Sequence, residues 1–148
     1  MANALPHERV RLIFDATELR YDFGPQHPLQ PGRLEALIDL LAVSGLWRAE
    51  QAETRLDFRP ATINELSLVH TPDYITAVQQ LSQPEAEITG EKALRERVAL
   101  ALKYGFGDGD TPPLPGMHGV SARIAGGTLV AMSAVMGLPE GGAFEHEE

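Results

Sequence analysis

The chain has 148 residues, a formal net charge of −9 and 43% apolar residues, which is enough to form the core of one ordinary domain. The charge argues against nucleic acid and anionic membranes as partners, because both need clustered Lys and Arg. The chain has no cysteine, which excludes disulfides, thiolate-bound metals and thiol nucleophiles. The N-terminus lacks a secretory pattern, and no apolar stretch approaches the roughly 18–20 residues that span a bilayer. We therefore expect a soluble, cytoplasmic protein.

Two short strands are predicted in the first half of the chain. Residues 10–14 are rich in β-forming types, and residues 54–58 alternate between polar and apolar types. Between them, residues 15–32 carry three prolines, which exclude a regular helix and predict a loop. A third candidate strand lies near residues 143–144.

The clearest helix is predicted over residues 33–44, where leucine and isoleucine recur at i, i+3, i+4 and i+7 and Gly45 follows as a stop signal. Two further helices have start signals, a capping box from Thr62 to Glu65 and a Thr71-Pro72-Asp73 sequence. Further helices are predicted over residues 62–69, 71–81, 91–104 and 117–136. The last contains two adjacent glycines, which cost about 1 kcal/mol each relative to Ala and so predict that another backbone passes close by.

The order of these elements indicates the fold class. Strands alternate with helices, which favours an α/β fold with a parallel sheet. Two clear strands are few for a sheet, which usually has four to six. We therefore expect an incomplete unit, or one completed by a partner.

The ionisable residues form no obvious site. A zinc site made of His27, His70 and His118 would have to be assembled by the fold, and polar loop histidines are the plainer interpretation. Asp108 and Asp110 could help to bind a hard cation, although a turn explains both residues equally.

The remaining candidates are weaker. The glycine-rich residues 105–109 lack the Lys-Ser/Thr ending of a phosphate loop, and no serine lies in a Gly-x-Ser-x-Gly elbow. Arg33 follows a proline-rich loop and opens a helix. There it could bind a carboxylate through a bidentate fork or simply face solvent.

Four stretches taken together resemble the histone deacetylase superfamily, and most closely its bacterial branch, the acetoin-utilisation deacetylases. They are a proline-rich loop that begins with Tyr21 and ends with Arg33, a His-Thr-x-x-Tyr-Ile helix start, a Gly-Asp-x-Pro loop followed by Pro-Gly, and a Gly-Gly pair. These stretches lie at residues 21–33, 70–75, 109–117 and 125–128. Their order and spacing fit that superfamily from about residue 10 to 144.

The resemblance implies a fold and a reaction. The fold would be a three-layer α/β/α sandwich with a parallel sheet, of the arginase/deacetylase type, with residues 1–148 as the N-terminal part of one such domain. The parent reaction would be hydrolysis of acetyl-lysine or a similar acylated amine. In the parent family, a zinc ion held by two aspartates and a histidine activates the water.

The resemblance also assigns roles to six residues of this chain. Asp110 matches the aspartate at the tunnel rim that hydrogen-bonds the substrate backbone. Arg33 matches the arginine of the internal cavity below the metal. The loop beside the tunnel is matched by Tyr21, Gly24, His27 and Pro28.

The family's metal-binding motifs have no counterpart here, because the chain contains no His-His pair and no Asp-x-His sequence. We therefore expect an inactive N-terminal portion of a deacetylase-like amidohydrolase, with no zinc bound to this chain and a disordered tail over residues 145–148. The alternative is a non-catalytic module that associates with itself or a partner through an open sheet edge and apolar helix faces. A cation-binding or small-ligand domain using Asp108 and Asp110 is the third possibility.

Overall fold

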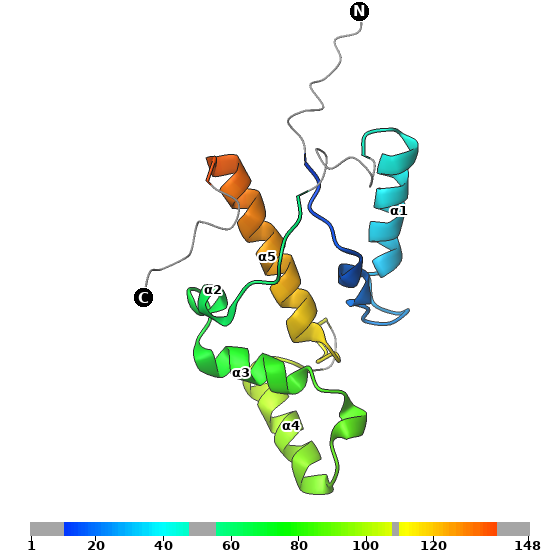
Figure 1. Cartoon of the computed structure of the whole chain (residues 1–148). Helices are drawn as coiled ribbons and strands as arrows, with labels where there is room; N and C mark the ends of the chain where they lie inside the picture. The colour runs from blue at the N-terminus through cyan, green and yellow to red at the C-terminus, as the bar shows by residue number, and fades with distance from the viewer. Residues whose placement is uncertain (1–10, 48–55, 108–109, 139–148) are drawn as a thin grey trace, which may run out of the picture.

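The structure, a computed structural model, describes residues 11–47, 56–107 and 110–138. In this part of the chain, helices dominate and surround a long helix near the centre of the molecule (Figure 1). The elements in chain order are η2 (Ala16–Arg20), α1 (Pro31–Val43), α2 (Ile63–Ser67), α3 (Pro72–Leu81), η4 (Glu85–Glu87), α4 (Glu91–Lys103) and α5 (Met117–Met136).

The helix starts predicted at Thr62 and Thr71 are confirmed, whereas α1 begins at Pro31, two residues before its predicted start at residue 33. Thr62 Oγ1 accepts a hydrogen bond from the backbone N–H of Glu65 at 3.2 Å, and a Glu65 carboxylate oxygen accepts from the Thr62 N–H at 2.6 Å. Thr71 Oγ1 accepts from the N–H of Tyr74 at 3.3 Å. Each contact satisfies an N–H group that has no partner within its helix. The short helix α2 ends two residues earlier than predicted.

Two short helices, η2 and η4, were not predicted. Residues 15–32 were expected to be a loop, but η2 begins directly after Asp15. Asp15 accepts a hydrogen bond from the N–H of Thr17 at 2.8 Å, and Glu18 accepts one from the N–H of Asp15 at 3.2 Å. This is a capping box with Asp at the first position, so the Asp-x-x-Glu sequence was the signal for the helix.

The predicted strands are not confirmed by the residues that the structure describes. Among residues 11–14 and 56–58, only Leu12 takes part in a bridge, and the N–H of Leu56 donates to the Leu12 carbonyl at 3.2 Å. A strand ladder needs repeated backbone pairing, and these two segments supply one bond to each other. Residues 10 and 54–55 and the third candidate strand lie outside the described ranges.

The two extended segments lie against α5 at its glycine pair (Figure 1). A Cβ atom at Gly126 would lie 1.9 Å from the Arg59 carbonyl oxygen, and one at Gly127 would lie 2.8 Å from Ile13. The N–H of Ala61 donates to the Ala122 carbonyl of α5 at 2.8 Å. The predicted close approach of another backbone is therefore confirmed, because only glycine leaves room for this crossing.

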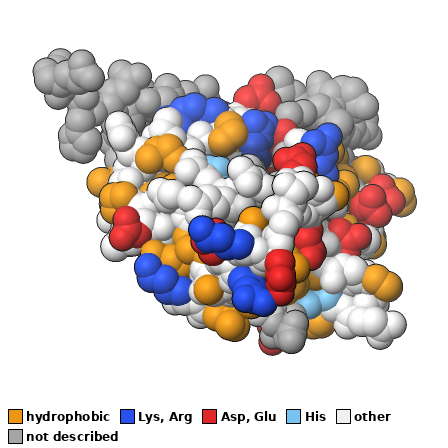
Figure 2. Space-filling view, turned by 90° about the horizontal axis from the view of Figure 1, so that it is seen from below, with side chains coloured by type: hydrophobic (Ala, Val, Ile, Leu, Met, Phe, Trp, Pro, Cys, Tyr) orange, Lys and Arg blue, Asp and Glu red, His pale blue; other side chains and the backbone are white. Residues whose placement is uncertain are grey.

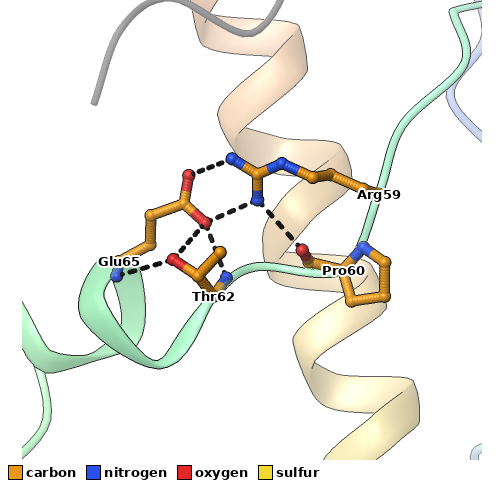
Figure 3. Close-up of polar contacts among 4 residues, drawn as sticks. All are labelled: Arg59, Pro60, Thr62 and Glu65. Carbon is orange, nitrogen blue, oxygen red and sulfur yellow. Dashed lines mark hydrogen bonds and ion pairs between the residues drawn. The ribbon is translucent and has the colours of Figure 1, made fainter. Parts of the chain in front are cut away.

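An ion pair fixes the segment that crosses α5 (Figure 3). The Arg59 guanidinium binds both carboxylate oxygens of Glu65, at 2.7 and 2.8 Å, and also donates to the Pro60 carbonyl. The same carboxylate accepts from Thr62, so one glutamate joins the crossing segment to the start of α2. Chiefly because of the Arg59 hydrogen bonds, the pKa of Glu65 falls to about 2.

A second ion pair joins η2 to α5. Arg123 donates to Asp15 at 2.6 Å, and its guanidinium lies 4.6 Å from the centre of the Phe58 ring. The Asp15 pKa is lowered, first by hydrogen bonds from Thr17 and then by Arg123. Arg123 therefore links Asp15, at the start of η2, to Phe58 in the segment that crosses α5.

The start of α5 is held by the end of α3. Ser82 accepts the N–H of His118 through its hydroxyl at 2.7 Å and the N–H of Gly116 through its carbonyl at 2.8 Å. Beside this junction, Leu81 is fully buried and packs with Ala101 of α4 and Met117 of α5. This cluster joins α3, α4 and α5.

Helix α5 corrects one expectation. It has 20 residues and is long and apolar enough, by length and composition, to cross a membrane, whereas the sequence pattern predicted no such stretch. One helix of this kind is weak evidence for a membrane, since a core helix passes the same test. The Arg123–Asp15 ion pair and the crossing at the glycine pair place protein against one side of it.

Candidate functional site

A cavity of about 340 Å³ lies where η2, the start of α1 and the middle of α5 meet. Tyr21 and Arg33, two of the residues assigned by resemblance, both line it. Leu34, Leu37 and Ile124 form apolar walls, so the charged Arg33 and an apolar surface line the same cavity. The other lining residues are Glu18, Leu29, Gln30 and Pro31.

Arg33 lies in the first turn of α1. Pro31 begins the helix, and its fixed backbone angle suits the first helical position. The Arg33 guanidinium approaches the Pro28 carbonyl at 3.4 Å, a long contact that leaves most of its donors available within the described residues. A guanidinium at a helix N-terminus favours an anionic group such as a carboxylate.

Glu18 supplies the acidic side of the same cavity. Burial raises its pKa, and the neighbouring Asp15 charge raises it further, while the Asp15 N–H and Arg123 lower it. The pKa shift therefore favours a neutral carboxyl more than in water.

The loop before α1 is stiffened by stacked rings. Phe23 stacks on His27 with ring centroids 4.4 Å apart, and Tyr21 meets Phe23 edge-on at 4.7 Å. His27 Nδ1 accepts from the Leu29 N–H at 3.0 Å. Gly24 adopts a positive φ of 87°, which only glycine adopts readily. The loop thus holds Tyr21 at the cavity wall, while Gly24, His27 and Pro28 shape the loop rather than line the cavity.

A second cavity of about 190 Å³ shares Tyr21 with the first. It is lined by His70, Tyr74 and His118, with Phe106 and other apolar residues. His70 lies against Tyr74, with ring centroids 5.0 Å apart. His118 Nε2 lies 3.4 Å from the Gln79 amide nitrogen.

The zinc alternative built from three histidines does not hold in this arrangement. His70 and His118 share the second cavity, but His27 is stacked in the loop and lines neither cavity. Within the described ranges, no three His, Asp or Glu side chains come together closely enough to hold a metal. The residues that the structure describes therefore do not fit the zinc ion of the parent family.

Asp110 lies apart from both cavities. It is exposed, and it follows residues 108–109, which are outside the described ranges. The loop around it is closed by the Thr111 hydroxyl, which donates to the Gly105 carbonyl at 3.1 Å. The cation-site alternative with Asp108 therefore falls partly outside what the structure describes.

The remaining candidates have structural explanations. Gly105 adopts a positive φ of 78° at the end of α4, so the glycine-rich stretch begins as a helix stop. The hydroxyls of Ser44, Ser67 and Ser82 donate to carbonyls of their own helices. These serines cap or brace helices, and none is set up as a nucleophile.

Sequence reasoning missed two features of the site. Glu18 lines the Arg33 cavity, and the Asp-x-x-Glu capping box would have placed it on a short helix. The sequence gives a weaker indication of the aromatic cavity around Tyr74. The His-Thr-x-x-Tyr-Ile helix start contains two of its lining residues, His70 and Tyr74.

The comparison with protein families decides where this chain belongs. The model of the histone deacetylase domain matches residues 27–144. The chain belongs to the histone deacetylase domain family. Membership implies an arginase/deacetylase-like α/β fold, although the described residues show almost no strand.

The similar curated proteins point the same way. The chain is 32% identical over 142 residues to the acetoin utilization protein AcuC of Staphylococcus aureus, covering 92% of this chain and 33% of that relative. It is 34% identical over 124 residues to AcuC of Bacillus subtilis, covering 84% and 29%. The chain therefore spans about a third of the length of these relatives. No solved structure matches it.

Proposed function

We propose that this chain forms the substrate-side part of a deacetylase of the acetoin-utilisation type, whose whole domain hydrolyses acetyl-lysine or a similar acylated amine. The observation that carries the proposal is the cavity that brings Arg33 and Tyr21 together beside apolar walls. Such a cavity suits a small carboxylate, the product of amide hydrolysis, because a guanidinium recognises carboxylate oxygens in pairs.

The residues take separate roles in this proposal. Arg33 binds the released carboxylate inside the cavity, and the stiff loop with Gly24, His27 and Pro28 keeps Tyr21 at its wall. Asp110, exposed in its own loop, binds the backbone of the incoming substrate. These groups bind and orient; none of them activates water.

The family's zinc supplies the activated water when it is bound. Since the described residues of this chain do not fit that ion, we propose that the chain does not hydrolyse acetyl-lysine by itself. Purified chain incubated with an acetyl-lysine peptide and zinc is expected to release no acetate. Zinc-dependent acetate release by the chain alone would contradict this.

A chimera tests the positive part of the proposal. In B. subtilis AcuC, the matching segment is replaced by this chain, and acetate release from an acetyl-lysine peptide is measured. Arg33→Leu is expected to lower kcat by about tenfold or more, because each tenfold corresponds to about 1.4 kcal/mol of lost stabilisation. Arg95→Leu, an exposed arginine on α4 that pairs with Glu91, is the matched control and should leave kcat unchanged.

Asp110→Asn in the same chimera separates the two roles. It is expected to raise KM for the peptide more than it lowers kcat, because it acts in substrate binding. An Arg33→Leu chimera with full kcat would remove the support that the cavity gives to the proposed function.

A further inference from the structure

The second cavity, of about 190 Å³, has no role in the function proposed above. We call it the Tyr74 cavity, because the Tyr74 ring contacts three other rings there. The ring centroids lie 5.0 Å away at His70, 5.7 Å at Tyr104 and 6.3 Å at Phe106. The Phe106 ring is nearly parallel to that of Tyr74, at 18°, and both residues line the cavity. A planar ligand packs favourably against aromatic faces of this kind.

One wall of the Tyr74 cavity belongs to the buried core. Met117 lines the cavity, is only 2% exposed and packs in one cluster with Leu81 and Ala101. Tyr21 and Phe106, which also line the cavity, pack against the same cluster. Helices α3, α4 and α5 therefore hold this wall in place, so the cavity exists before a ligand enters it, as ligand cavities usually do.

Polar side chains line the same cavity and have no partners of their own. Within the described residues, the side chains of Tyr21, His70, Tyr74 and Ser121 make no hydrogen bond. A fifth polar residue, His118, has only the 3.4 Å approach of its Nε2 to the Gln79 amide. Hydroxyl and imidazole groups can both donate and accept. A ligand hydroxyl inside the cavity therefore has several possible partners.

The cavity contrasts with the surface in its charge. Among the residues that the structure describes, no Asp, Glu, Lys or Arg lines the Tyr74 cavity. On the lower face of the molecule, acidic and basic side chains are interspersed with apolar ones (Figure 2). An ionised ligand loses hydration when it enters a cavity and needs an opposite charge there. The cavity lining therefore favours an uncharged ligand.

The volume limits the size of that ligand. It corresponds to about six water molecules at about 30 Å³ each, which is enough for one six-membered ring with a small substituent. We propose that the Tyr74 cavity binds a small, uncharged aromatic molecule that carries a hydroxyl group, that is, a phenol. Its ring packs against Tyr74 and Phe106, and its hydroxyl bonds to the unpaired polar side chains. This site does not rest on the proposed function, because Arg33 and Asp110 take no part in it.

Three matched ligands test the proposal on the unmodified 148-residue chain. Phenol, toluene and benzoate are each titrated into the chain, and binding is followed by proton NMR. Phenol is expected to bind with a Kd of about 1 mM or lower. Toluene lacks the hydroxyl and should bind at least about fivefold more weakly. Benzoate carries a charge and should bind at least about tenfold more weakly.

The same spectra locate the site. Ring-proton signals of His70 and His118 should move as phenol is added, because both residues line the cavity. The signal of His27, which is stacked on Phe23 and lines neither cavity, should stay in place. This readout separates binding in the Tyr74 cavity from binding elsewhere on the chain.

A larger side chain in the wall should block the cavity. Ala125 lines it, so Ala125→Leu is expected to weaken phenol binding by at least about tenfold. Ala134 is exposed on the same helix and lines neither cavity, so Ala134→Leu is the matched control and should leave the affinity unchanged. Far-UV circular dichroism of each variant must match that of the unmodified chain.

A gentler substitution tests the hydroxyl groups alone. Tyr21→Phe combined with Tyr74→Phe keeps both rings and removes both phenol hydroxyls. Phenol binding should weaken about fivefold, and toluene binding should not change. Tyr104→Phe is the matched control, because Tyr104 contacts the Tyr74 ring but does not line the cavity.

Several results would overturn the proposal. Failure of phenol to bind would do so, as would equal affinities for phenol and toluene or for phenol and benzoate. Unmoved His70 and His118 signals, or full phenol affinity in a folded Ala125→Leu chain, would place the binding elsewhere and reject the site. If Ala125→Leu does not fold, the ligand series and the Tyr→Phe pair decide. None of these outcomes bears on the Arg33 cavity.

Discussion

The two halves of α5 show how differently one helix can be held. The first half is capped by Ser82, paired to Asp15 through Arg123 and crossed at Gly126 by the segment before α2. The second half exposes Val135 and its apolar neighbours. The helix is continuous, so the difference comes from what packs against each half and not from its local conformation.

This difference predicts which substitutions in α5 change the stability of the chain. Substitutions in the first half should change the stability of this chain, because they break contacts that are already made. Substitutions of the exposed side chains in the second half should change the stability less, because those side chains make fewer contacts within the described residues. The following predictions test the contacts that hold the first half of α5 and compare them with an exposed residue, from the largest expected effect to the smallest.

Gly126→Ala should have the largest effect. The new Cβ would lie 1.9 Å from the Arg59 carbonyl oxygen, so the crossing segment must move, and we expect a loss of about 3 kcal/mol in the free energy of unfolding. Urea unfolding followed by circular dichroism measures it. Gly119→Ala in the same helix meets no atom within 4 Å and should instead stabilise by about 0.5–1 kcal/mol. Equal changes in the free energy of unfolding for the two variants would contradict the close backbone approach at Gly126.

Glu65→Gln should lower the free energy of unfolding at pH 7 by about 1–2 kcal/mol, because it removes a charged partner from half-exposed Arg59. The Glu65 pKa is lowered from 4.5 to about 2 in the folded chain. Its contribution is therefore fully present above pH 4.5 and is lost as the pH falls toward 2. Urea unfolding of both chains between pH 7 and pH 2.5 should show the difference shrinking. A difference that does not change with pH would contradict the ion pair.

Ser82→Ala should cost about 1 kcal/mol, because the His118 N–H at the start of α5 loses its acceptor. Ser44→Ala, which removes an exposed hydroxyl bonded to its own helix, is the control and should be near neutral. Thermal unfolding of both variants gives the comparison. If Ser44→Ala costs as much, the cap on α5 is not the cause.

Arg33→Ala should have the smallest effect on stability, within about 0.5 kcal/mol of the unmodified chain. Among the described residues, the exposed side chain makes one long hydrogen bond, with the Pro28 carbonyl. Urea unfolding at pH 7 measures the effect. A large loss would show that this arginine supports the fold, and it would weaken the carboxylate-binding role proposed for the cavity.

Much of the local structure could be predicted from the sequence. The helix starts at Thr62 and Thr71 and the whole of α5 were placed correctly, because capping and apolar spacing act within a few residues. The capping box at Asp15 is an equally clear helix signal. The three prolines that follow exclude a long helix but not the short η2, which ends before them. The strands failed for a different reason. Their residue types favour extended backbone, and the chain is extended there, but a strand also needs neighbours to pair with.

The candidate site divides in the same way. Resemblance singled out Tyr21 and Arg33, and the structure brings both to one cavity. It could not indicate that Glu18 joins them, or that His70 and His118 share a cavity from which His27 is excluded. Those placements depend on η2, α1 and α5 meeting, and no local pattern encodes such a meeting.

By itself, the sequence determined the helices, their caps, the family and the need for a close backbone approach at the glycine pair. These follow from interactions between residues a few positions apart, or from motifs whose order is visible in the chain. Only the tertiary structure decided which backbone fills the space beside Gly126, which residues share the Arg33 cavity, and which half of α5 is left uncovered. Each of these depends on segments dozens of residues apart, whose contact is set by packing and not by local preference.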